Sequence, residues 1–331
     1  MDFPFGLPAV FEEGASPENG DAAPVRLSSS ADSFLPGASL GPSGLTDDAP
    51  EETDFETVYS LYRQKVCALD GTGAQFLLLN RQTSLADMRA GLLAARDKNL
   101  PVAACLNVGK RRNCGFLPAL ITLQAMGASA VGLCGTPGAH MAERFRTASA
   151  HTSVPLAAVI DAEPGQSARE YADAARPLLD AGARILGCGT NASPEHLRAL
   201  RELAKKYGPP EISEEPDCIA AATEREAFFL GDDIRFSEPL ACTASLVDRL
   251  IDLDDEQVTA ALVCVESIAD ADLLGRCAPM SHLPIAVRAD SATVLDAALR
   301  YVQGRLIVDS GSSVEREVLE PIAAKYGAIV Y

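Results

Sequence analysis

The stretch Gly182-Ala-Arg-Ile-Leu-Gly-Cys-Gly-Thr-Asn-Ala-Ser-Pro-Glu-His-Leu-Arg-Ala-Leu200 decides the fold. It begins with a short apolar strand, Arg184 to Gly187, which runs through a Gly/Cys turn into a helix. Ser193 is the expected N-cap of that helix and Pro194 its first residue. Cys188 therefore stands at the carboxyl end of a strand, which is where α/β barrels and open sheets place their reactive groups.

Short apolar strands alternate with segments of helical periodicity on both sides of this stretch, which indicates βα units and a parallel sheet. Six strands fall before residue 207, against the eight of a closed barrel. We therefore expect α/β architecture with an incomplete TIM-barrel-like unit, followed by a second partial βα unit. The six strands are expected at 39–40, 75–79, 101–107, 130–134, 155–160 and 184–188, with helices at 55–69, 85–97, 117–126, 140–148, 167–181 and 194–207.

Composition divides the chain into four parts. Residues 1–36 are rich in Pro, Gly, Ser, Ala and acid, which predicts an irregular N-terminal arm. The first partial barrel occupies 37–207, and a Pro- and acid-rich linker follows at 208–224. The second unit, 225–331, is expected to open with a hairpin of 227–230 with 234–236 and to continue through strands at 260–265, 284–288, 306–308 and 328–331.

The net charge and the cysteine spacing limit the binding partners and the cellular compartment that we expect. The 28 Lys+Arg against 46 Asp+Glu give 28 − 46 = −18, which disfavours nucleic acid and anionic membranes as partners. Nine cysteines are scattered without the spacing of a disulfide framework, so we expect reduced thiols and a cytoplasmic protein. No apolar segment approaches the roughly 18 residues of a membrane span.

The central stretch resembles the zinc-binding end of the homocysteine S-methyltransferase domain of cobalamin-dependent methionine synthase. In that family a Gly-Gly-Cys-Cys-Gly-Thr run precedes Pro-Glu-His; here Pro194-Glu195-His196 is present and the paired cysteines are not. Gly41-Pro-Ser-Gly44 resembles the family's Gly-Pro-Thr-Gly turn, and Gly132-Leu-Cys-Gly-Thr-Pro-Gly138 resembles the loop that carries its first zinc cysteine. The resemblance covers residues 39–206 and implies a truncated, degenerate homocysteine-binding barrel.

A weaker resemblance links the C-terminal third to the pterin-binding barrel that follows this domain in methionine synthase. It rests on Ala298-Leu-Arg-Tyr-Val-Gln-Gly-Arg-Leu-Ile-Val-Asp-Ser310, which has Asp309-Ser310 where that family has Asn-Ser. Asp290-Ser291 and Asp309-Ser310 end consecutive strands and would face a shared pocket or act as helix N-caps, of which we favour the caps.

The resemblance also implies a site. Cys134 and Cys188 would be zinc ligands, with a third ligand left open among His140, His151, Asp161 and a more distant cysteine. Zinc would lower the pKa of a homocysteine thiol. Two thiolates bind zinc more weakly than three, so we favour two ordinary thiols in a degenerate pocket. The implied substrate-binding positions are Gly41, Asn80, which stands where the family has a Glu, and Gly189 and Thr190. An alignment of equal length puts Gly189 and Thr190 at the paired cysteines, whereas an alignment with a gap puts Cys188 at one of those two places.

Two functions follow. The first is a homocysteine S-methyltransferase-like enzyme of methionine synthesis, with zinc-thiolate methyl transfer to homocysteine; family resemblance favours it. The second is a catalytically degenerate methionine-synthase-like subunit with a binding, regulatory or assembly role, which the missing residues favour. Neither reading gives the chain a cobalamin site of its own, so a corrinoid- or folate-carrying methyltransferase would be a separate partner. His196 is expected to be a structural contact rather than a ligand.

Overall fold

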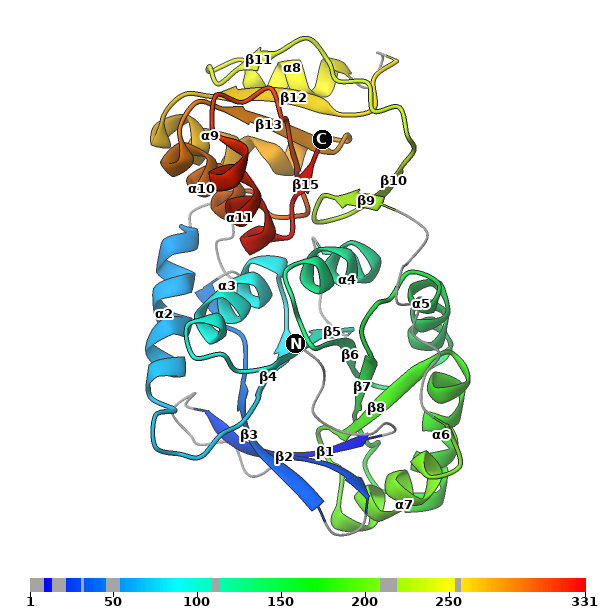
Figure 1. The fold of residues 1–331 in the computed structure, drawn as a ribbon. Helices are drawn as coiled ribbons and strands as arrows, with labels where there is room; N and C mark the ends of the chain where they lie inside the picture. The colour runs from blue at the N-terminus through cyan, green and yellow to red at the C-terminus, as the bar shows by residue number, and fades with distance from the viewer. Residues whose placement is uncertain are drawn as a thin grey trace. The chain divides into compact units, whose positions relative to one another are not determined.

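The computed structural model describes residues 9–13, 22–30, 33–45, 54–108, 114–208, 219–253 and 257–331. Residue contacts divide the chain into two compact units (Figure 1). The first consists of 1–112 and 128–216, and the second of 113–127 and 217–331. The predicted domain 37–207 includes residues 113–127, whereas the contacts of this segment assign it to the second unit.

The first unit is a closed eight-stranded barrel in which the strands pair in chain order and β8 returns to β1. Its strands are β1 (Ala9–Glu13), β2 (Ala23–Ser30), β3 (Ser33–Leu40), β4 (Leu77–Gln82), β5 (Val102–Asn107), β6 (Ala130–Gly135), β7 (Leu156–Ile160) and β8 (Ala183–Cys188). The expectation of an incomplete barrel of about six strands is wrong. The expected strand at 39–40 is the end of β3, and β1 and β2 were not expected.

The two unexpected strands lie in the predicted irregular arm, and the direction of β2 explains why they were missed. β2 is antiparallel to both β1 and β3, whereas β1 is parallel to β8 and β3 is parallel to β4. Antiparallel neighbours need no crossover helix, and none of the described residues between β1 and β3 is helical. The βα rhythm is therefore absent from this third of the barrel wall. Residues 1–8, 14–21 and 31–32 of the arm lie outside the described residues.

The barrel interior is filled by one side-chain layer from every strand, because alternate residues of a strand face the same side. Phe11 and Phe76 stack there with ring centroids 5.9 Å apart. A side chain at Gly37 would overlap the Phe76 ring, so this position must be glycine. The layer consists of Ala9, Phe11, Val25, Leu27, Leu35, Phe76, Leu78, Ala103, Cys105, Ala130, Cys134, Ala157, Val159 and Ile185.

Five helices among the described residues of the first unit lie outside the barrel wall (Figure 1). They are α2 (Phe55–Cys67), α3 (Leu85–Arg96), α5 (Ala139–Ser149), α6 (Ala168–Asp180) and α7 (Pro194–Ala204). The expected start of α7 is confirmed, since Ser193 is its N-cap and Pro194 its first residue. The Ser193 side chain accepts a hydrogen bond from the His196 backbone N–H, which fixes the direction in which the chain leaves β8.

The second unit is built on a five-stranded parallel sheet whose strands also follow one another in chain order. The strands are β11 (Leu240–Ala241), β12 (Ala261–Val265), β13 (Ile285–Ala289), β14 (Ile307–Val308) and β15 (Ile329–Val330). Right-handed crossovers in constant order put the connecting helices on one face. These are α8 (Leu246–Asp252), α9 (Ile268–Cys277) with the short η2 (Ala278–Met280), α10 (Ala292–Tyr301) and α11 (Arg316–Tyr326).

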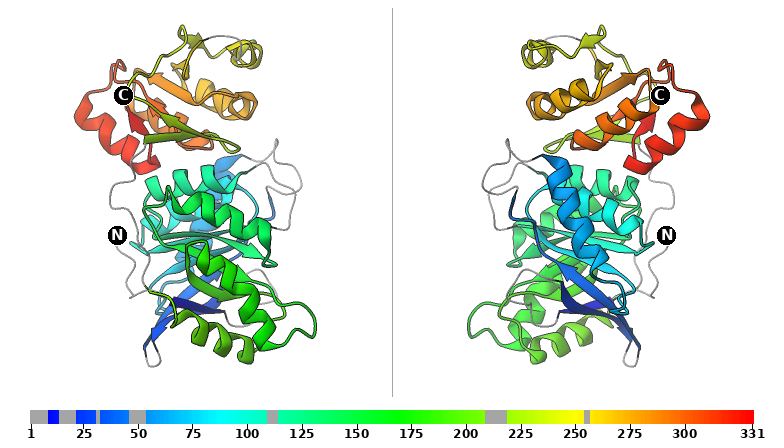
Figure 2. Two further views of the ribbon diagram at one scale, coloured as in Figure 1. Left: turned by 90° about the vertical axis from the view of Figure 1, so that its right-hand side faces the viewer. Right: turned by 90° about the vertical axis from the view of Figure 1, so that its left-hand side faces the viewer.

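A small hairpin of β9 (Ile219–Ala222) and β10 (Ala227–Leu230) lies beside this sheet (Figure 2). Ala221 packs against the sheet, whereas Ala220 and Ala222 pack against Ile121 of α4 (Phe116–Ala125). The hairpin predicted between 227–230 and 234–236 is therefore wrong. The partner of β10 lies within the segment read as a linker, of which residues 209–218 are outside the described residues.

Close packing between β6 and β7 gives a test of the barrel. A Cβ at Gly132 would overlap the backbone oxygen of Ala157, which cannot move without breaking the strand pairing. We expect Gly132→Ala to lower the free energy of unfolding by about 3 kcal/mol in urea denaturation. Gly231→Ala is the control, since nothing lies within 4 Å of its Cβ, and we expect a change of about 0.5 kcal/mol or less. Equal effects of the two substitutions would contradict this packing.

Candidate active site at the barrel mouth

The loops that follow the parallel strands are tied to one another by backbone hydrogen bonds. Val108 N–H donates to the Cys134 carbonyl at 2.7 Å, Asp161 N–H to the Gly135 carbonyl at 3.0 Å, and Gly189 N–H to the Ile160 carbonyl at 2.7 Å. These bonds continue the sheet ladder beyond β5 to β8. The side chains at this end of the barrel therefore stand on fixed backbone, and we call this end the mouth.

An ion pair between Arg81 and Asp161 is the central polar feature of the mouth. Arg81 Nη1 lies 3.3 Å from Asp161 Oδ2, and Nη2 contacts Oδ1. Nη2 also donates to Thr190 Oγ1 at 2.7 Å, and Thr190 N–H donates to Asp161 Oδ1 at 2.7 Å. The side chains of Arg81 and Asp161 are 30% and 20% exposed, so the pair is partly screened from water. It joins the carboxyl ends of β4, β7 and β8.

Two predicted substrate-binding residues, Gly189 and Thr190, lie in this cluster. A Cβ at Gly189 would overlap Asp161 Oδ1 and would come within 2.9 Å of the Ile160 oxygen and 3.0 Å of Arg81 Nη2. Glycine is therefore required for the approach of this loop to Asp161. Thr190 contributes its hydroxyl and its backbone N–H to the cluster.

The other two predicted substrate-binding residues lie at the ends of β3 and β4. Asn80 is 3% exposed and shares the inward parity of Leu78. Gln82 Nε2 donates to the Asn80 carbonyl at 3.2 Å. The Tyr62 hydroxyl lies 3.1 Å from the Gly41 carbonyl and 2.8 Å from Gln82 Oε1. Burial, and then the nearby Asp87 carboxylate, raises the pKa of Tyr62. Tyr62 therefore remains a neutral hydrogen-bonding group that holds the Gly41 turn.

Cys134, the first predicted zinc ligand, lies inside the barrel. It has no exposed surface and belongs to the interior layer. Its Sγ contacts the Cys105 carbonyl oxygen at 3.8 Å.

Cys188, the second predicted ligand, faces the opposite side of the wall. Its neighbour Gly187 takes the inward position, where an added Cβ would meet Val159 and Phe11, so the next residue points outward. There Cys188 lies near Tyr171 of α6, whose hydroxyl donates to the Ile160 carbonyl at 2.6 Å. Burial raises the pKa of the Cys188 thiol to about 11, and the Tyr171 contact opposes this only in part. Cys188 is therefore a protonated thiol at neutral pH.

These residues do not fit a zinc ion. Thiolates bound to one zinc lie about 2.3 Å from it, and sulfurs on opposite faces of a strand wall cannot converge to that distance. The three named candidates for a third zinc ligand do not complete a site with these cysteines. His140 is exposed on α5, His151 follows the C-terminal end of α5, and Asp161 is paired with Arg81. Within the described ranges, no group of three His, Cys, Asp or Glu side chains has the geometry to hold a metal.

His196 is a structural residue, as expected. Its Nδ1 accepts from the Ser193 backbone N–H at 2.8 Å, so the Nε2, 2.9 Å from the Gln166 carbonyl, carries the proton and donates. The ring packs on Tyr171 at 4.7 Å between centroids. Both nitrogens are thus engaged in holding the start of α7.

Comparison with known sequences agrees with this architecture. The sequence model of the family "Homocysteine S-methyltransferase" matches residues 22–204, more than half of the chain. The chain belongs to the homocysteine S-methyltransferase family. The match begins at β2 and ends in α7, so it covers the barrel strands β2 to β8 and the loops of the mouth.

Relatives of this family member are distant. It is 23% identical over 327 residues to methionine synthase of Mycobacterium tuberculosis, an alignment covering 84% of this chain and 27% of that protein. The methionine synthase of Mycobacterium leprae is 22% identical over 339 residues, covering 84% and 28%. The chain thus spans about a quarter of the length of these relatives. The apo form of the Escherichia coli homocysteine methyltransferase MmuM is 19% identical, with a TM-score of 0.41, covering 50% of this chain and 60% of that one.

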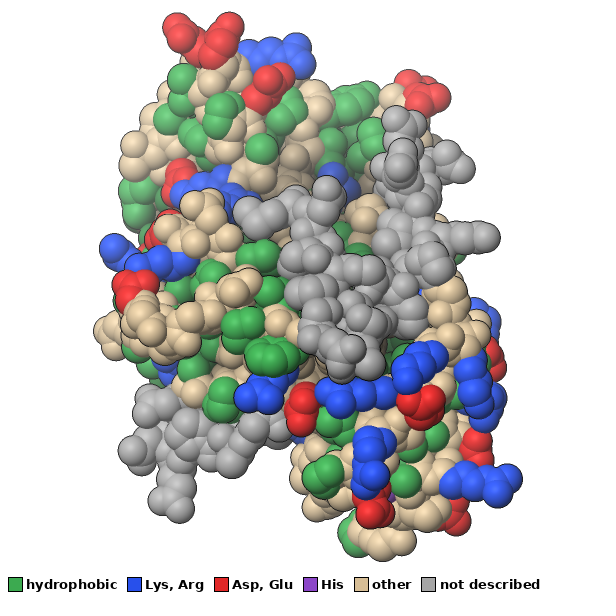
Figure 3. Space-filling model, turned by 60° about the horizontal axis from the view of Figure 1, so that its bottom comes forward, with side chains coloured by type: hydrophobic (Ala, Val, Ile, Leu, Met, Phe, Trp, Pro, Cys, Tyr) green, Lys and Arg blue, Asp and Glu red, His purple; other side chains and the backbone are tan. Residues whose placement is uncertain are grey.

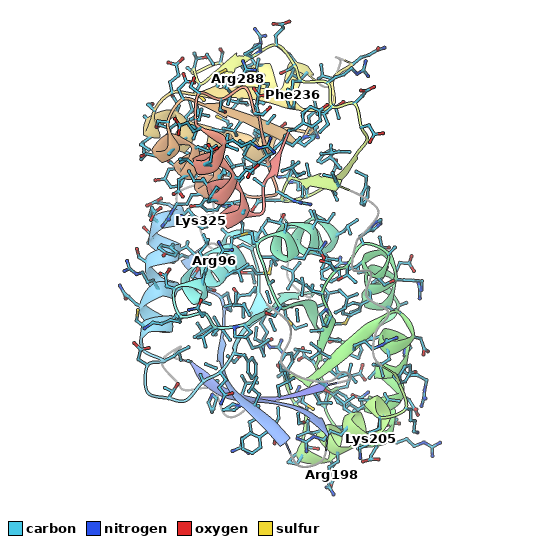
Figure 4. All side chains as sticks on the ribbon, viewed as in Figure 1. Arg96, Arg198, Lys205, Phe236, Arg288 and Lys325 are labelled. Carbon is cyan, nitrogen blue, oxygen red and sulfur yellow. The ribbon has the colours of Figure 1, made fainter. Side chains whose placement is uncertain are left out.

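The second unit of this family member carries a separate polar cluster at its strand ends. Asp309 is 6% exposed, its Oδ2 lies 2.5 Å from Arg288 Nε, and its Oδ1 accepts from the Gly311 N–H at 2.9 Å. Figure 4 labels Arg288 on the second unit. Ser291 caps α10 by accepting from the Val294 N–H, as favoured above. Asp309 is instead the acid of an ion pair between neighbouring strands.

A cavity of about 140 Å³ opens at the other end of this sheet. The hairpin turn and the loops before β13 and β14 line it, with Glu224, Glu226 and His282 among the charged or titratable side chains. It contains none of the residues predicted from the sequence.

Surface features add two observations about this family member. On the face in Figure 3, blue Lys and Arg side chains are interspersed with red Asp and Glu side chains rather than gathered into one basic patch. Among the helices that the structure describes, none combines the length and apolar character needed to span a bilayer.

The residue that sequence reasoning missed is Arg81. The sequence signal for Arg81 is a charged residue directly after an apolar strand. The neighbouring Asn80 was predicted instead, because it stands where the family has a Glu. Arg81 adopts a left-handed backbone conformation, with φ of 55°. This conformation interrupts the strand alternation, and strained residues of this kind cluster at functional sites.

The raised pKa of Cys188 predicts its reactivity. A shift from 9.0 to about 11 leaves about 100-fold less thiolate near pH 8. We expect the rate of Cys188 alkylation by iodoacetamide, followed by peptide mass spectrometry, to rise about tenfold per pH unit between pH 8 and pH 10. The exposed Cys67 is the control that shows the reagent is active, and it should be labelled before Cys188 at pH 8. Labelling of Cys188 at pH 7 as fast as that of Cys67 would show that it is an activated thiolate.

Proposed function

We propose that this chain is a metal-free, catalytically degenerate member of the homocysteine S-methyltransferase family. It binds homocysteine or a close analogue at the barrel mouth and serves as a binding subunit in methionine synthesis. The observation that carries this proposal is the opposite orientation of Cys134 and Cys188. A homocysteine thiol bound at the mouth would meet no thiolate-held metal, so it would keep its proton at neutral pH and remain a poor nucleophile.

The mouth supports binding better than it supports chemistry. The Asn80 amide stands at the inner face of β4, and Thr190 brings a hydroxyl and a backbone N–H to the end of β8. These groups suit the polar amino-acid end of homocysteine, as does the turn at Gly41. We assign the methyl donor to a partner protein that carries a corrinoid or a folate.

The second candidate is an active zinc-dependent methyltransferase. It is supported by the family match and by the two cysteines at the ends of β6 and β8. It requires Cys188 to turn through the wall toward the mouth, and the Arg81–Asp161 pair to open.

Metal analysis and ligand binding separate the two. We expect elemental analysis of tag-free protein to find zinc far below one atom per chain. Titration calorimetry with L-homocysteine should show binding, and an assay with a methyl-corrinoid or S-methyl donor should form no methionine. Stoichiometric zinc that is lost in a Cys134→Ala variant, together with turnover, would establish the active enzyme instead.

A substitution at the mouth tests the binding residues. Loss of one ligand hydrogen bond costs about 1.4 kcal/mol, so we expect Asn80→Ala to weaken homocysteine binding about tenfold. Gln75→Ala is the control, because Gln75 is exposed near the opposite end of β4. Equal affinities of the two variants would place the ligand elsewhere.

A further inference from the structure

The misfit between these residues and zinc leaves a question about what holds the mouth together. Three strand ends that are distant in sequence meet there, since Arg81 contacts Asp161 and Thr190 across 80 and 109 residues of chain. The Arg81 guanidinium, at the end of β4, contacts the residues that follow the other two strands. It donates to the carboxylate after β7 and to the hydroxyl after β8.

We propose that the Arg81 guanidinium is the permanent cation of the barrel mouth, standing in the role of the metal and tying the ends of β4, β7 and β8 together. The inference rests on the proposed metal-free function. It assigns Arg81 and Asp161 as positioning residues for the mouth, and it makes the folded state of the barrel independent of zinc.

The space around Gly189 links the missing cysteine to the ion pair. An alignment of equal length with the family's motif puts position 189 at one of the paired cysteines. A Cβ at this position would overlap Asp161 Oδ1 and crowd Arg81 Nη2. A cysteine at 189 and the Arg81–Asp161 pair therefore exclude each other in this backbone arrangement. The glycine at 189 and the ion pair therefore belong to the same arrangement of the mouth.

Charge and geometry fit the same role. A guanidinium offers planar, fixed donors that match a carboxylate in pairs, so it can bridge several loops as a directional cation. Asp161 neutralises it, and Thr190 adds a neutral acceptor, so the cluster needs no thiolate. The left-handed backbone of Arg81 turns its side chain across the mouth, and the contacts with β7 and β8 hold that conformation in place.

The test is thermal unfolding of the full chain with and without zinc. We expect wild-type protein to unfold at the same temperature in EDTA and in excess zinc, and Arg81→Met to unfold about 4–8 °C lower in both. Arg146→Met is the matched control, because its pair with Glu143 on α5 is exposed on both sides and contributes little. Arg81→Lys, which keeps the charge but not the fork, should fall between the two.

A double-mutant cycle connects the pair to Gly189. Gly189→Ala should lower the unfolding temperature strongly in the wild-type background and clearly less in the Asp161→Ala background, where the overlapping oxygen is absent. If Arg81→Met does not fold, Thr190→Val, which removes one acceptor, gives the smaller shift to be compared.

The outcomes separate this inference from the proposed function. Stabilisation of the wild-type protein by zinc would overturn both. Indifference to zinc together with an Arg81→Met shift no larger than that of Arg146→Met would overturn the role of Arg81 alone, as would additive effects of Gly189→Ala and Asp161→Ala.

Discussion

The pairing of β1 with β8 is the constraint on which the rest of the first unit depends. Ala9, Val10 and Phe11 pair in parallel register with Ile185, Leu186 and Gly187, and this pairing closes the barrel. A closed barrel has a fixed inside and outside, and strand alternation then assigns every residue to one of them. Cys134 of β6 falls inside and Cys188 of β8 outside, and a change of one residue in the register of β8 would turn Cys188 to the inner face.

This assignment shapes the chemistry that the mouth offers. The chain belongs to a methyltransferase family, while Gly189 and Thr190 at the barrel mouth are packed against an ion pair. The thiol that remains at the end of β8 is protonated and turned toward α6. A polar, rigid mouth without an activated sulfur is suited to holding a ligand rather than transforming it.

Part of this structure follows from sequence. The apolar runs of β4 to β8 and the capped start of α7 are local signals, and they were predicted within a few residues. β1 and β2 were missed because their hairpin lies among Pro, Gly and Ser, although the alternation of buried Ala23, Val25 and Leu27 with exposed Pro24 and Arg26 is a strand signal.

The site was harder to predict. The importance of Gly189 and Thr190 came from alignment, but the face on which Cys188 lies depends on barrel register. The reach of Arg81 depends on a left-handed φ and on two loops more than 75 residues away, and neither has a local sequence signature.

The central claim is that an ion pair, and not a metal, occupies the barrel mouth. Crystals grown with excess zinc and measured at the zinc absorption edge test it most directly. The account predicts no anomalous peak at the carboxyl ends of β6 to β8 and an intact contact between Arg81 and Asp161. A strong peak there, bonded to Cys134 or Cys188 with Arg81 displaced, would contradict it.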